Sequence, residues 1–243
     1  MDYEEQVTAI TGGSRGIGAA VARRLAADGH AVLIGYRSDQ EAARSVAADI
    51  IDRGEVASIA PVDVTDATSL AAFFDTAAAM GPLMGVVASA GAVRAVGSLR
   101  ELDPDDLRRD IDVNLLGAVL TARASIAHLE KTRGSIVFIG SAAATLGSPH
   151  TYVHYAAAKA GVSALSLGLS KELAPLGVRV NCVEPGIIRT DFHLDPDRPD
   201  KLASTIPLGR PGEPAEVTGA VAWLLSADAG YVTGATIRVA GGR

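Results

Sequence analysis

Residues 7–18 read Val-Thr-Ala-Ile-Thr-Gly-Gly-Ser-Arg-Gly-Ile-Gly: an apolar run enters a glycine-rich turn, which opens a helix-like segment. This order is typical of dinucleotide-binding sites in parallel α/β sheets, because glycine lets the backbone approach a pyrophosphate at the amide dipoles of a helix N-terminus. A glycine-rich turn without a ligand is the alternative interpretation. The residues that the motif assigns to a cofactor are Gly12, Ser14, Arg15, Gly16, Ile17 and Gly18.

The alternation of short apolar runs with longer amphipathic segments continues along the chain. It predicts an α/β fold for residues 1–243, a single-domain, Rossmann-type, doubly wound parallel sheet of about seven strands with helices on both faces. Strands are predicted at Val7–Thr11, Ala31–Tyr36, Val56–Pro61, Gly85–Ser89, Gly134–Gly140, Val178–Val183 and Ala235–Val239. Helices are predicted at Gly16–Asp28, Asp39–Arg53, Ala67–Ala79, Pro104–Leu129, Tyr152–Ala174 and Pro214–Ser226.

The segment Thr190–Pro207 departs from this alternation. It carries three prolines and four aspartates, the latter at positions 191, 195, 197 and 200. Long irregular segments within compact domains are commonly functional, so we predict a mobile substrate lid at about residues 190–207. Its aspartates are expected to form a solvated face and to disfavour an acidic substrate at the lid.

The composition of the chain indicates which kinds of partner and which cellular compartment to expect. The net charge of −6 argues against a nucleic-acid surface. Cys182 is the single cysteine, which excludes an intrachain disulfide and is typical of a reducing compartment. No apolar segment reaches the roughly 18–20 residues that span a bilayer, and the acidic residues 1–6 lack a signal-peptide core. We therefore predict a cytoplasmic protein with a small-molecule partner and with neither a nucleic-acid nor a membrane partner.

The end of the second predicted strand bears on the choice of cofactor. NAD sites typically place an acid there for the ribose 2′-hydroxyl, whereas NADP sites offer arginine to the 2′-phosphate. Here the sequence Ile34-Gly35-Tyr36-Arg37-Ser38 has no acid before Asp39. Arg37, with Arg15 as a second guanidinium, therefore favours NADP(H) over NAD(H). The alternative is that Arg37 is a solvated surface residue.

Tyr155 and Lys159 lie four residues apart in a predicted helix, and residues at this spacing share one helix face. A fixed cation beside a phenol is expected to lower the tyrosine pKa below its usual value of about 10. Such a tyrosine exchanges protons near neutral pH, as a general acid or base must. The spacing alone is weak evidence, because it also occurs by chance on exposed helices.

Further short motifs accompany these features in a fixed order: Asp63-Val64, Ala88-Ser89-Ala90-Gly91, Asn114, Ser141, Asn181, Pro185-Gly186, and the ending Tyr231–Thr236 with Gly241-Gly242. With them the chain resembles the short-chain dehydrogenase/reductase family over essentially its full length. Within the family it is most similar to the bacterial 3-oxoacyl-(acyl-carrier-protein) reductase and glucose-dehydrogenase-like group. The resemblance implies hydride transfer between a nicotinamide cofactor and a carbonyl or secondary alcohol.

The resemblance assigns further residues to the cofactor. Asp63 is expected to contact the adenine amino group, with Val64 lining that pocket. The alternatives are a helix cap for Asp63 and an ordinary turn for Pro185-Gly186. The residues expected around the ribose and the nicotinamide are Ser89, Ala90, Gly91, Tyr155, Lys159, Pro185, Gly186, Ile188 and Thr190.

The resemblance also implies a catalytic tetrad of Asn114, Ser141, Tyr155 and Lys159. Tyr155 would exchange the proton, and Ser141 would hydrogen-bond the same substrate oxygen. Lys159 would lower the pKa of Tyr155 and bind the ribose hydroxyls, while Asn114 would hold a water that links Lys159 to solvent. A lone serine at a strand end or asparagine in a helix is usually structural, but the four together favour the catalytic interpretation.

Three departures from the family pattern limit this assignment. Ala88-Ser89-Ala90-Gly91 stands where Asn-Asn-Ala-Gly is usual, so the hydrogen bonding at this strand end is in doubt. Ser141 lies fourteen residues before Tyr155, where thirteen is commoner, which should lengthen the Ala142–His154 loop. Ala240 occupies a position where aspartate is frequent.

Three histidines, His150, His154 and His193, lie in segments expected near the substrate. No cysteine or carboxylate completes a ligand set, so we predict no metal. A substrate hydrogen bond from His154 or Tyr152 is the better hypothesis. The expected pocket wall is Ala142–Ala144, His150–His154, Ile187 and Phe192–Ile206.

Small residues along Tyr152–Ala174, together with the resemblance, predict a homotetramer or homodimer, unless they only permit close packing on the sheet. The leading functional hypothesis is an NADPH-dependent ketoreductase. One alternative is a reductase of carrier- or CoA-bound 3-oxoacyl or polyketide substrates, for which Arg94, Arg100, Arg108 and Arg109 are candidate docking residues. Another is a nucleotide-binding sensor or scaffold without turnover.

Overall fold

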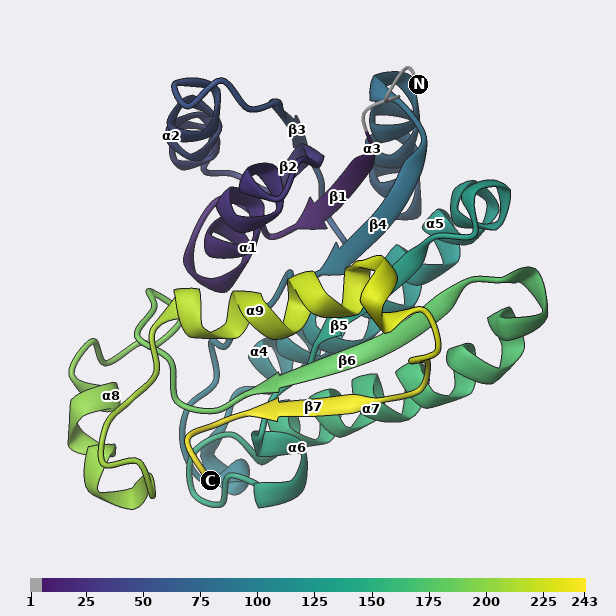
Figure 1. The fold of residues 1–243 in the computed structure, drawn as a ribbon. Coiled ribbons are helices and arrows are strands. Elements are labelled where there is room, and N and C mark those ends of the chain that lie inside the picture. Colours follow the sequence, from purple (N-terminus) through teal and green to yellow (C-terminus); the bar gives the residue numbers. More distant parts are fainter. Residues whose placement is uncertain (1–5) are drawn as a thin grey trace.

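The computed structural model describes residues 6–243, and its framework is one parallel sheet in the order β3-β2-β1-β4-β5-β6-β7 (Figure 1). Residues 1–5, on which the prediction that the chain lacks a signal-peptide core rests in part, lie outside the described residues. β1, β2 and β5 are buried along their whole length, as expected of strands covered on both faces. The strands are β1 (Val7–Thr11), β2 (Ala31–Tyr36), β3 (Ala57–Pro61), β4 (Leu83–Ala88), β5 (Ser135–Ile139), β6 (Arg179–Pro185) and β7 (Thr236–Val239).

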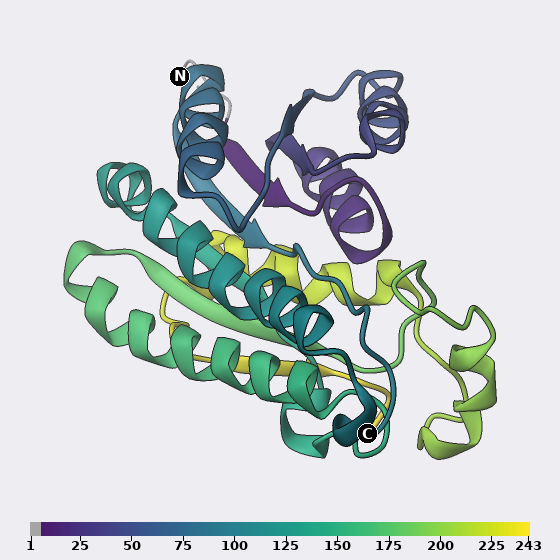
Figure 2. The ribbon, with the colours of Figure 1, turned by 180° about the vertical axis from the view of Figure 1, so that it is seen from behind.

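Helices cover the two faces of the sheet, and each face has its own apolar core. One face carries α1 (Gly16–Ala27), α2 (Gln40–Ile51) and α9 (Pro214–Leu225), which lie in front in Figure 1. The opposite face carries α3 (Ala67–Met80), α5 (Gly117–Thr132) and α7 (Val153–Leu173), seen from behind in Figure 2. The remaining elements are α4 (Pro104–Ile111), the short helices α6 (Ala143–Leu146) and α8 (Arg198–Lys201), and 3₁₀ turns at Leu99–Glu101, Ala174–Leu176, Ala203–Thr205 and Ala227–Ala229.

Short polar side chains fix where several helices begin. Asp39 accepts a hydrogen bond from the Ala42 N–H at the start of α2, and Asp66 accepts one from the Thr68 N–H at the start of α3. Such caps bind N–H groups that have no partner within the helix. The seven predicted strands and five of the six predicted helices are confirmed, with boundaries that differ by a few residues. Among residues 6–243, no helix is long and apolar enough to cross a bilayer.

The prediction of one continuous helix over Pro104–Leu129 is wrong. A π-helical segment, Asp112–Leu116, separates α4 from α5. Within it, the Asn114 side-chain amide donates to the Asp110 carbonyl at 2.8 Å, the group that the Asn114 backbone N–H would bind in an uninterrupted α-helix. π-Helical turns inside helices frequently mark functional positions.

The segment predicted as a lid follows β6 and contains α8 (Figure 1). Ion pairs bind it together: Arg189 contacts Asp200 at 2.5 Å, and Lys201 contacts Asp195 at 2.8 Å. These pairs give local order to a stretch in which the sequence shows no helical periodicity.

Candidate active site

A cavity of about 840 Å³ lies at the carboxyl ends of the central strands. This is where open α/β sheets bind ligands, because neighbouring strands there lead into helices on opposite faces. The cavity is lined by every residue that the sequence assigned to cofactor or catalysis except Asn114: Gly12, Ser14, Arg15, Gly16, Ile17, Gly18, Arg37, Asp63, Val64, Ser89, Ala90, Gly91, Ser141, Tyr155, Lys159, Pro185, Gly186, Ile188 and Thr190.

The glycine-rich loop between β1 and α1 fits a pyrophosphate. Gly12 has φ +67°, and a Cβ on it would lie 2.8 Å from the Ala90 Cα, so only glycine permits this approach to the end of β4. α1 begins at Gly16, and Arg15 before it provides no side-chain cap. Among residues 6–243, the first N–H groups of α1 have no side-chain acceptor, so they suit an anionic ligand.

Arg37 and Asp63 lie beside one another at the ends of β2 and β3. The guanidinium Nε of Arg37 is 3.1 Å from the Asp63 carboxylate, which also accepts hydrogen bonds from the Thr65 N–H and hydroxyl. Burial raises the pKa of Asp63, but the Thr65 hydrogen bonds and the Arg37 charge outweigh burial and hold it below its usual value. Asp63 does not cap α3, because Asp66 occupies that position.

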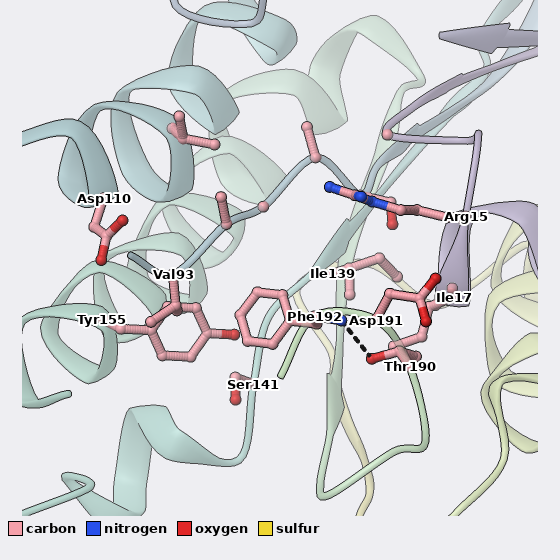
Figure 3. Close-up of a pocket in the computed structure, with 18 of the residues that line it drawn as sticks. Arg15, Ile17, Val93, Asp110, Ile139, Ser141, Tyr155, Thr190, Asp191 and Phe192 are labelled. Carbon is pink, nitrogen blue, oxygen red and sulfur yellow. Dashed lines mark hydrogen bonds between the residues drawn. The ribbon is translucent and has the colours of Figure 1, made fainter. Parts of the chain in front are cut away.

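Tyr155 and Lys159 lie on α7, are 7% and 5% exposed, and face the cavity together with Ser141 at the end of β5. Lys159 Nζ lies 5.7 Å from the centre of the Tyr155 ring and donates to the Ile139 carbonyl at 2.8 Å. The Ser141 hydroxyl accepts from the Ala143 N–H at 3.1 Å. In Figure 3 the phenol projects from α7 toward the middle of the cavity, with Ser141 nearby.

The predicted lowering of the Tyr155 pKa is wrong for this structure. Burial raises the pKa of Tyr155 above its usual value, and the Ser141 hydroxyl opposes this only in part. Burial also lowers the pKa of Lys159 to about 8. Both shifts have one cause, since removal from water disfavours the charged form of each group. Tyr155 is therefore a neutral phenol at pH 7, the form that can donate a proton.

Asn114 lies behind the main cavity. Its side-chain amide donates to the carbonyls of Ala92 and Asp110, while its buried Oδ1 has no hydrogen-bond partner among residues 6–243. A Cβ on Gly91 would lie 3.0 Å from this oxygen and 3.8 Å from Lys159 Nζ, so both atoms lie close to Gly91. A small internal cavity of about 10 Å³ is lined by both Asn114 and Lys159.

His154 does not reach the substrate cavity, contrary to the hypothesis that it binds substrate. It is 6% exposed, and its Nε2 lies 2.9 Å from the carboxylate of Asp110, which is 1% exposed. The same carboxylate accepts from the N–H groups of Arg94 and Ala95. Asp110 therefore joins the loop after β4 to the start of α7. Among the described residues, no group of three or more potential ligands forms a metal site.

Aromatic side chains form the wall at the substrate end. The Tyr152 ring stands edge-on to Tyr155 at 5.2 Å. The Phe192 ring lies 5.6 Å from Tyr155, and Figure 3 shows these two side chains next to each other. Val93 completes this apolar cluster, although no motif in the sequence pointed to it. Of the predicted wall, only Tyr152, Ile187, Phe192, His193, Leu194 and Arg198 line the cavity. Ala142–Ala144, the rest of His150–His154 and the remainder of Phe192–Ile206 do not.

Comparison with known proteins identifies the family. Residues 12–243 match a family model described as enoyl-(acyl carrier protein) reductase. The structure superposes, with a TM-score of 0.91, on a short-chain dehydrogenase from Burkholderia cenocepacia in complex with NADP, at 34% identity over 98% of this chain and 97% of that one. The chain belongs to the short-chain dehydrogenase/reductase family. It is therefore an oxidoreductase that acts on CH–OH or C=O groups.

Two relatives of this short-chain dehydrogenase/reductase have named substrates. The chain is 39% identical over 244 residues to cis-4-hydroxycyclohexanecarboxylate dehydrogenase of Sinomonas cyclohexanicum, covering 99% of this chain and 97% of the relative. It is 38% identical over 250 residues to 3beta-hydroxysteroid dehydrogenase 1 of Eggerthella lenta, covering 99% and 94%.

The structure accommodates the three departures from the family pattern. Beside Ser89, the Ala90 N–H donates to the Thr11 hydroxyl at 3.4 Å, which joins the ends of β4 and β1. The loop between Ser141 and Tyr155 contains α6, and Ser148 and His150 in it have positive φ values of 44° and 58°. At Ala240 the chain packs against Gly186, where a Cβ would lie 2.7 Å from the Ala240 Cα.

Proposed function

We propose that this enzyme is an NADPH-dependent ketone reductase, reversible as a secondary-alcohol dehydrogenase, in which Tyr155 is the general acid and base. One observation carries the proposal: a single cavity brings the uncapped start of α1 together with Ser141, Tyr155 and Lys159. A sensor without turnover has no need of these three side chains beside the nucleotide loop.

The nicotinamide cofactor, when bound, supplies or accepts the hydride. Ser141 holds the carbonyl oxygen by a hydrogen bond, and Tyr155 donates its proton to that oxygen as negative charge develops there. Lys159 stabilises the phenolate that remains and binds the ribose hydroxyls. The raised pKa of Tyr155 keeps the proton in place until the substrate oxygen becomes basic.

We place a proton relay at Asn114. The 10 Å³ cavity between Asn114 and Lys159 is near the lower limit for one water, which requires about 10–15 Å³. A water there would accept from Lys159 and donate to the otherwise unpartnered Asn114 Oδ1. The proton lost by Tyr155 would be replaced along this path.

We assign the preference for NADP(H) to Arg37 and Arg15. Both are exposed at the nucleotide end of the cavity, and a guanidinium can bind a phosphate through two parallel hydrogen bonds. The ion pair with Asp63 holds Arg37 at the side of the cavity expected to receive the adenosine. The NADP complex of the Burkholderia relative supports this assignment.

The substrate that fits best is a ketone on a ring. Tyr152, Phe192 and Val93 form an apolar, largely aromatic wall beside Tyr155, which suits hydrocarbon around the reacting carbon. Two of the relatives, 3beta-hydroxysteroid dehydrogenase 1 and cis-4-hydroxycyclohexanecarboxylate dehydrogenase, are named for alcohols on carbon rings. We propose that residues 190–207 cover the substrate as a lid, because Phe192 contacts Tyr155 from this segment.

A carrier-bound 3-oxoacyl substrate has less support. Its candidate docking residues include Arg108 and Arg109, and these form ion pairs with Asp105 and Asp106 on their own helix. Their charge is therefore largely balanced at the surface where a carrier would dock.

The assembly we propose is a homotetramer or homodimer. Exposed apolar side chains, Ile111, Leu116 and Leu167, lie on the helical face formed by α4, α5 and α7. A Cβ on Gly161 would lie 2.8 Å from the Leu115 side chain, so Gly161 serves packing within the chain. Gly168 has open space around it and adjoins Leu167, which suits contact with a second copy.

The test of the proposed function is NADPH oxidation, followed by its absorbance, with ring ketones, 3-oxoacyl thioesters, quinones and sugars, and with NADH in parallel. We expect turnover of at least one ring ketone, with NADPH preferred over NADH. Tight NADPH binding without turnover of any ketone class would favour the sensor hypothesis instead.

A further inference from the structure

Arg198 is a cation at the substrate end of the cavity. It begins α8, is half-buried, and lines the same cavity as Tyr155. Its guanidinium carbon lies 5.1 Å from the centre of the Tyr152 ring, and the Tyr152 ring lies 5.2 Å from that of Tyr155. One aromatic ring therefore separates the guanidinium from the reacting phenol.

The guanidinium of Arg198 has no carboxylate partner in the part of the chain that the structure describes, unlike its neighbours. Arg189 contacts Asp200 and Glu213, Lys201 contacts Asp195, and Arg210 contacts Glu216. Asp195 influences Arg198 only through its charge and is held by Lys201 at 2.8 Å. Within residues 6–243, the Arg198 side chain also donates no hydrogen bond.

Other charged groups of the cavity lie elsewhere or are neutralised. Asp191 lies beside Ile17 and Thr190, on the glycine-loop side of Phe192 (Figure 3). Arg109 is paired with Asp106 at 2.9 Å. Burial holds the pKa of His193 below its usual value, so His193 is neutral at pH 7. The exposed Arg94, in the loop after β4, adds positive charge and no negative charge.

We propose that Arg198 binds a carboxylate on the substrate, so that the enzyme acts on a ketone or alcohol whose reacting carbon and carboxylate are separated by about one six-membered ring. The planar fork of a guanidinium matches a carboxylate through two parallel hydrogen bonds. The contact with the Tyr152 ring holds the guanidinium at the cavity wall. This inference is built on the proposed reductase function.

The proposal reverses the expectation that the lid disfavours an acidic substrate. Asp195 and Asp200 are each neutralised by an ion pair, with Lys201 and Arg189 respectively. The unpaired charge that the lid contributes to the substrate end of the cavity is therefore positive, that of Arg198.

The test compares 4-oxocyclohexanecarboxylate with its methyl ester, which differ in charge at one end of the same ring ketone. We expect wild-type enzyme to prefer the acid in kcat/KM, and the acid-to-ester ratio to fall about tenfold in Arg198→Gln, through KM for the acid. Arg198→Lys should recover part of the ratio, because it keeps the charge without the fork. The matched control is Arg44→Gln, the same charge change at an exposed arginine that does not line the cavity, and it should leave the ratio unchanged.

Calorimetric titration of cyclohexanecarboxylate and its methyl ester separates this inference from the reductase proposal. We expect the protein with NADP⁺ to bind the acid more tightly than the ester, and Arg198→Gln to lose that difference. An equal acid-to-ester ratio in wild type and Arg198→Gln, or equal binding of acid and ester by wild type, overturns the role of Arg198. Acid binding that depends on Arg198, without turnover of any ketone, supports the anion site and overturns the reductase.

Discussion

Burial of Tyr155 and Lys159 makes the charged form of each side chain less favourable, because a buried charge loses its contact with water. It therefore raises the pKa of Tyr155 and lowers the pKa of Lys159. The lysine carries the larger consequence for stability, because it is the group that must be charged at neutral pH. It is 5% exposed, and its ammonium has one protein partner within the described residues, the Ile139 carbonyl.

Lys159→Met should stabilise the cofactor-free protein at pH 7 while abolishing turnover. The pKa of Lys159 falls from 10.5 to about 8. Each unit of pKa shift corresponds to about 1.4 kcal/mol, and loss of the Ile139 hydrogen bond offsets about 1 kcal/mol, so we expect a gain of about 2–3 kcal/mol. Between the folded pKa of about 8 and the usual value of 10.5, the unfolded chain binds more protons. Wild-type stability therefore rises with pH across this window, and the advantage of the variant shrinks.

Chemical denaturation of both proteins from pH 7 to 10 measures this difference. Lys171→Met, an exposed lysine on the same helix, controls for the substitution itself. A constant difference between Lys159→Met and wild type across that range would show that Lys159 is not destabilised by burial.

Arg37→Ala should weaken NADPH without weakening NADH. Loss of a guanidinium from a phosphate is expected to raise KM for NADPH about tenfold, and the ribose hydroxyl of NADH makes no comparable contact. Arg44→Ala, an exposed arginine on α2 that does not line the cavity, is the control. Equal effects on the two cofactors would assign the phosphate to another group, with Arg15 the first to examine.

At the scale of elements, the π-helical segment and the Asp110 contacts hold the catalytic helix against the loop after β4. Asp110→Ala would leave His154 Nε2 and the N–H groups of Arg94 and Ala95 without their buried acceptor. We expect a loss of about 2–4 kcal/mol in the free energy of unfolding. Asp105→Ala, an exposed acid on the same helix, should cost less than about 1 kcal/mol. Urea unfolding compares them, and similar losses would contradict a structural role for Asp110.

Helices and strands with a clear hydrophobic periodicity were predictable from the sequence, and helices of about one turn were not. The strands and the long helices follow from apolar runs and amphipathic spacing. α6 and α8 have four residues each, too few to show a period. The π-helical break depends on where the Asn114 side chain finds a second acceptor, the Ala92 carbonyl, which only the folded chain brings near.

At the scale of the whole molecule, the sheet order explains why motifs far apart in sequence form one site. β1, β4, β5 and β6 lie side by side, so Gly12, Gly91, Ser141 and Pro185, which follow or end these strands, all reach one cavity. Each motif was recognisable in the sequence. The raised pKa of Tyr155 and the exposure of Arg198 to the cavity were not, because both depend on packing between segments.

The exposed apolar side chains Ile111, Leu116 and Leu167 are the proposed contact between copies of the chain. We expect light scattering with size-exclusion chromatography to give a mass of two or four chains. Leu167→Glu should shift that mass toward smaller species, because it places a charge in the proposed contact next to Gly168. A monomeric wild-type protein would show that this face is solvated.

The central claim is that Tyr155 exchanges the proton, and Tyr155→Phe tests it most directly. With the best ketone and saturating NADPH, we predict that kcat falls by roughly 10²–10⁴-fold, while the Kd for NADPH, measured by fluorescence, stays within about twofold of wild type. A variant that binds NADPH normally and retains kcat within a few-fold of wild type would contradict the account.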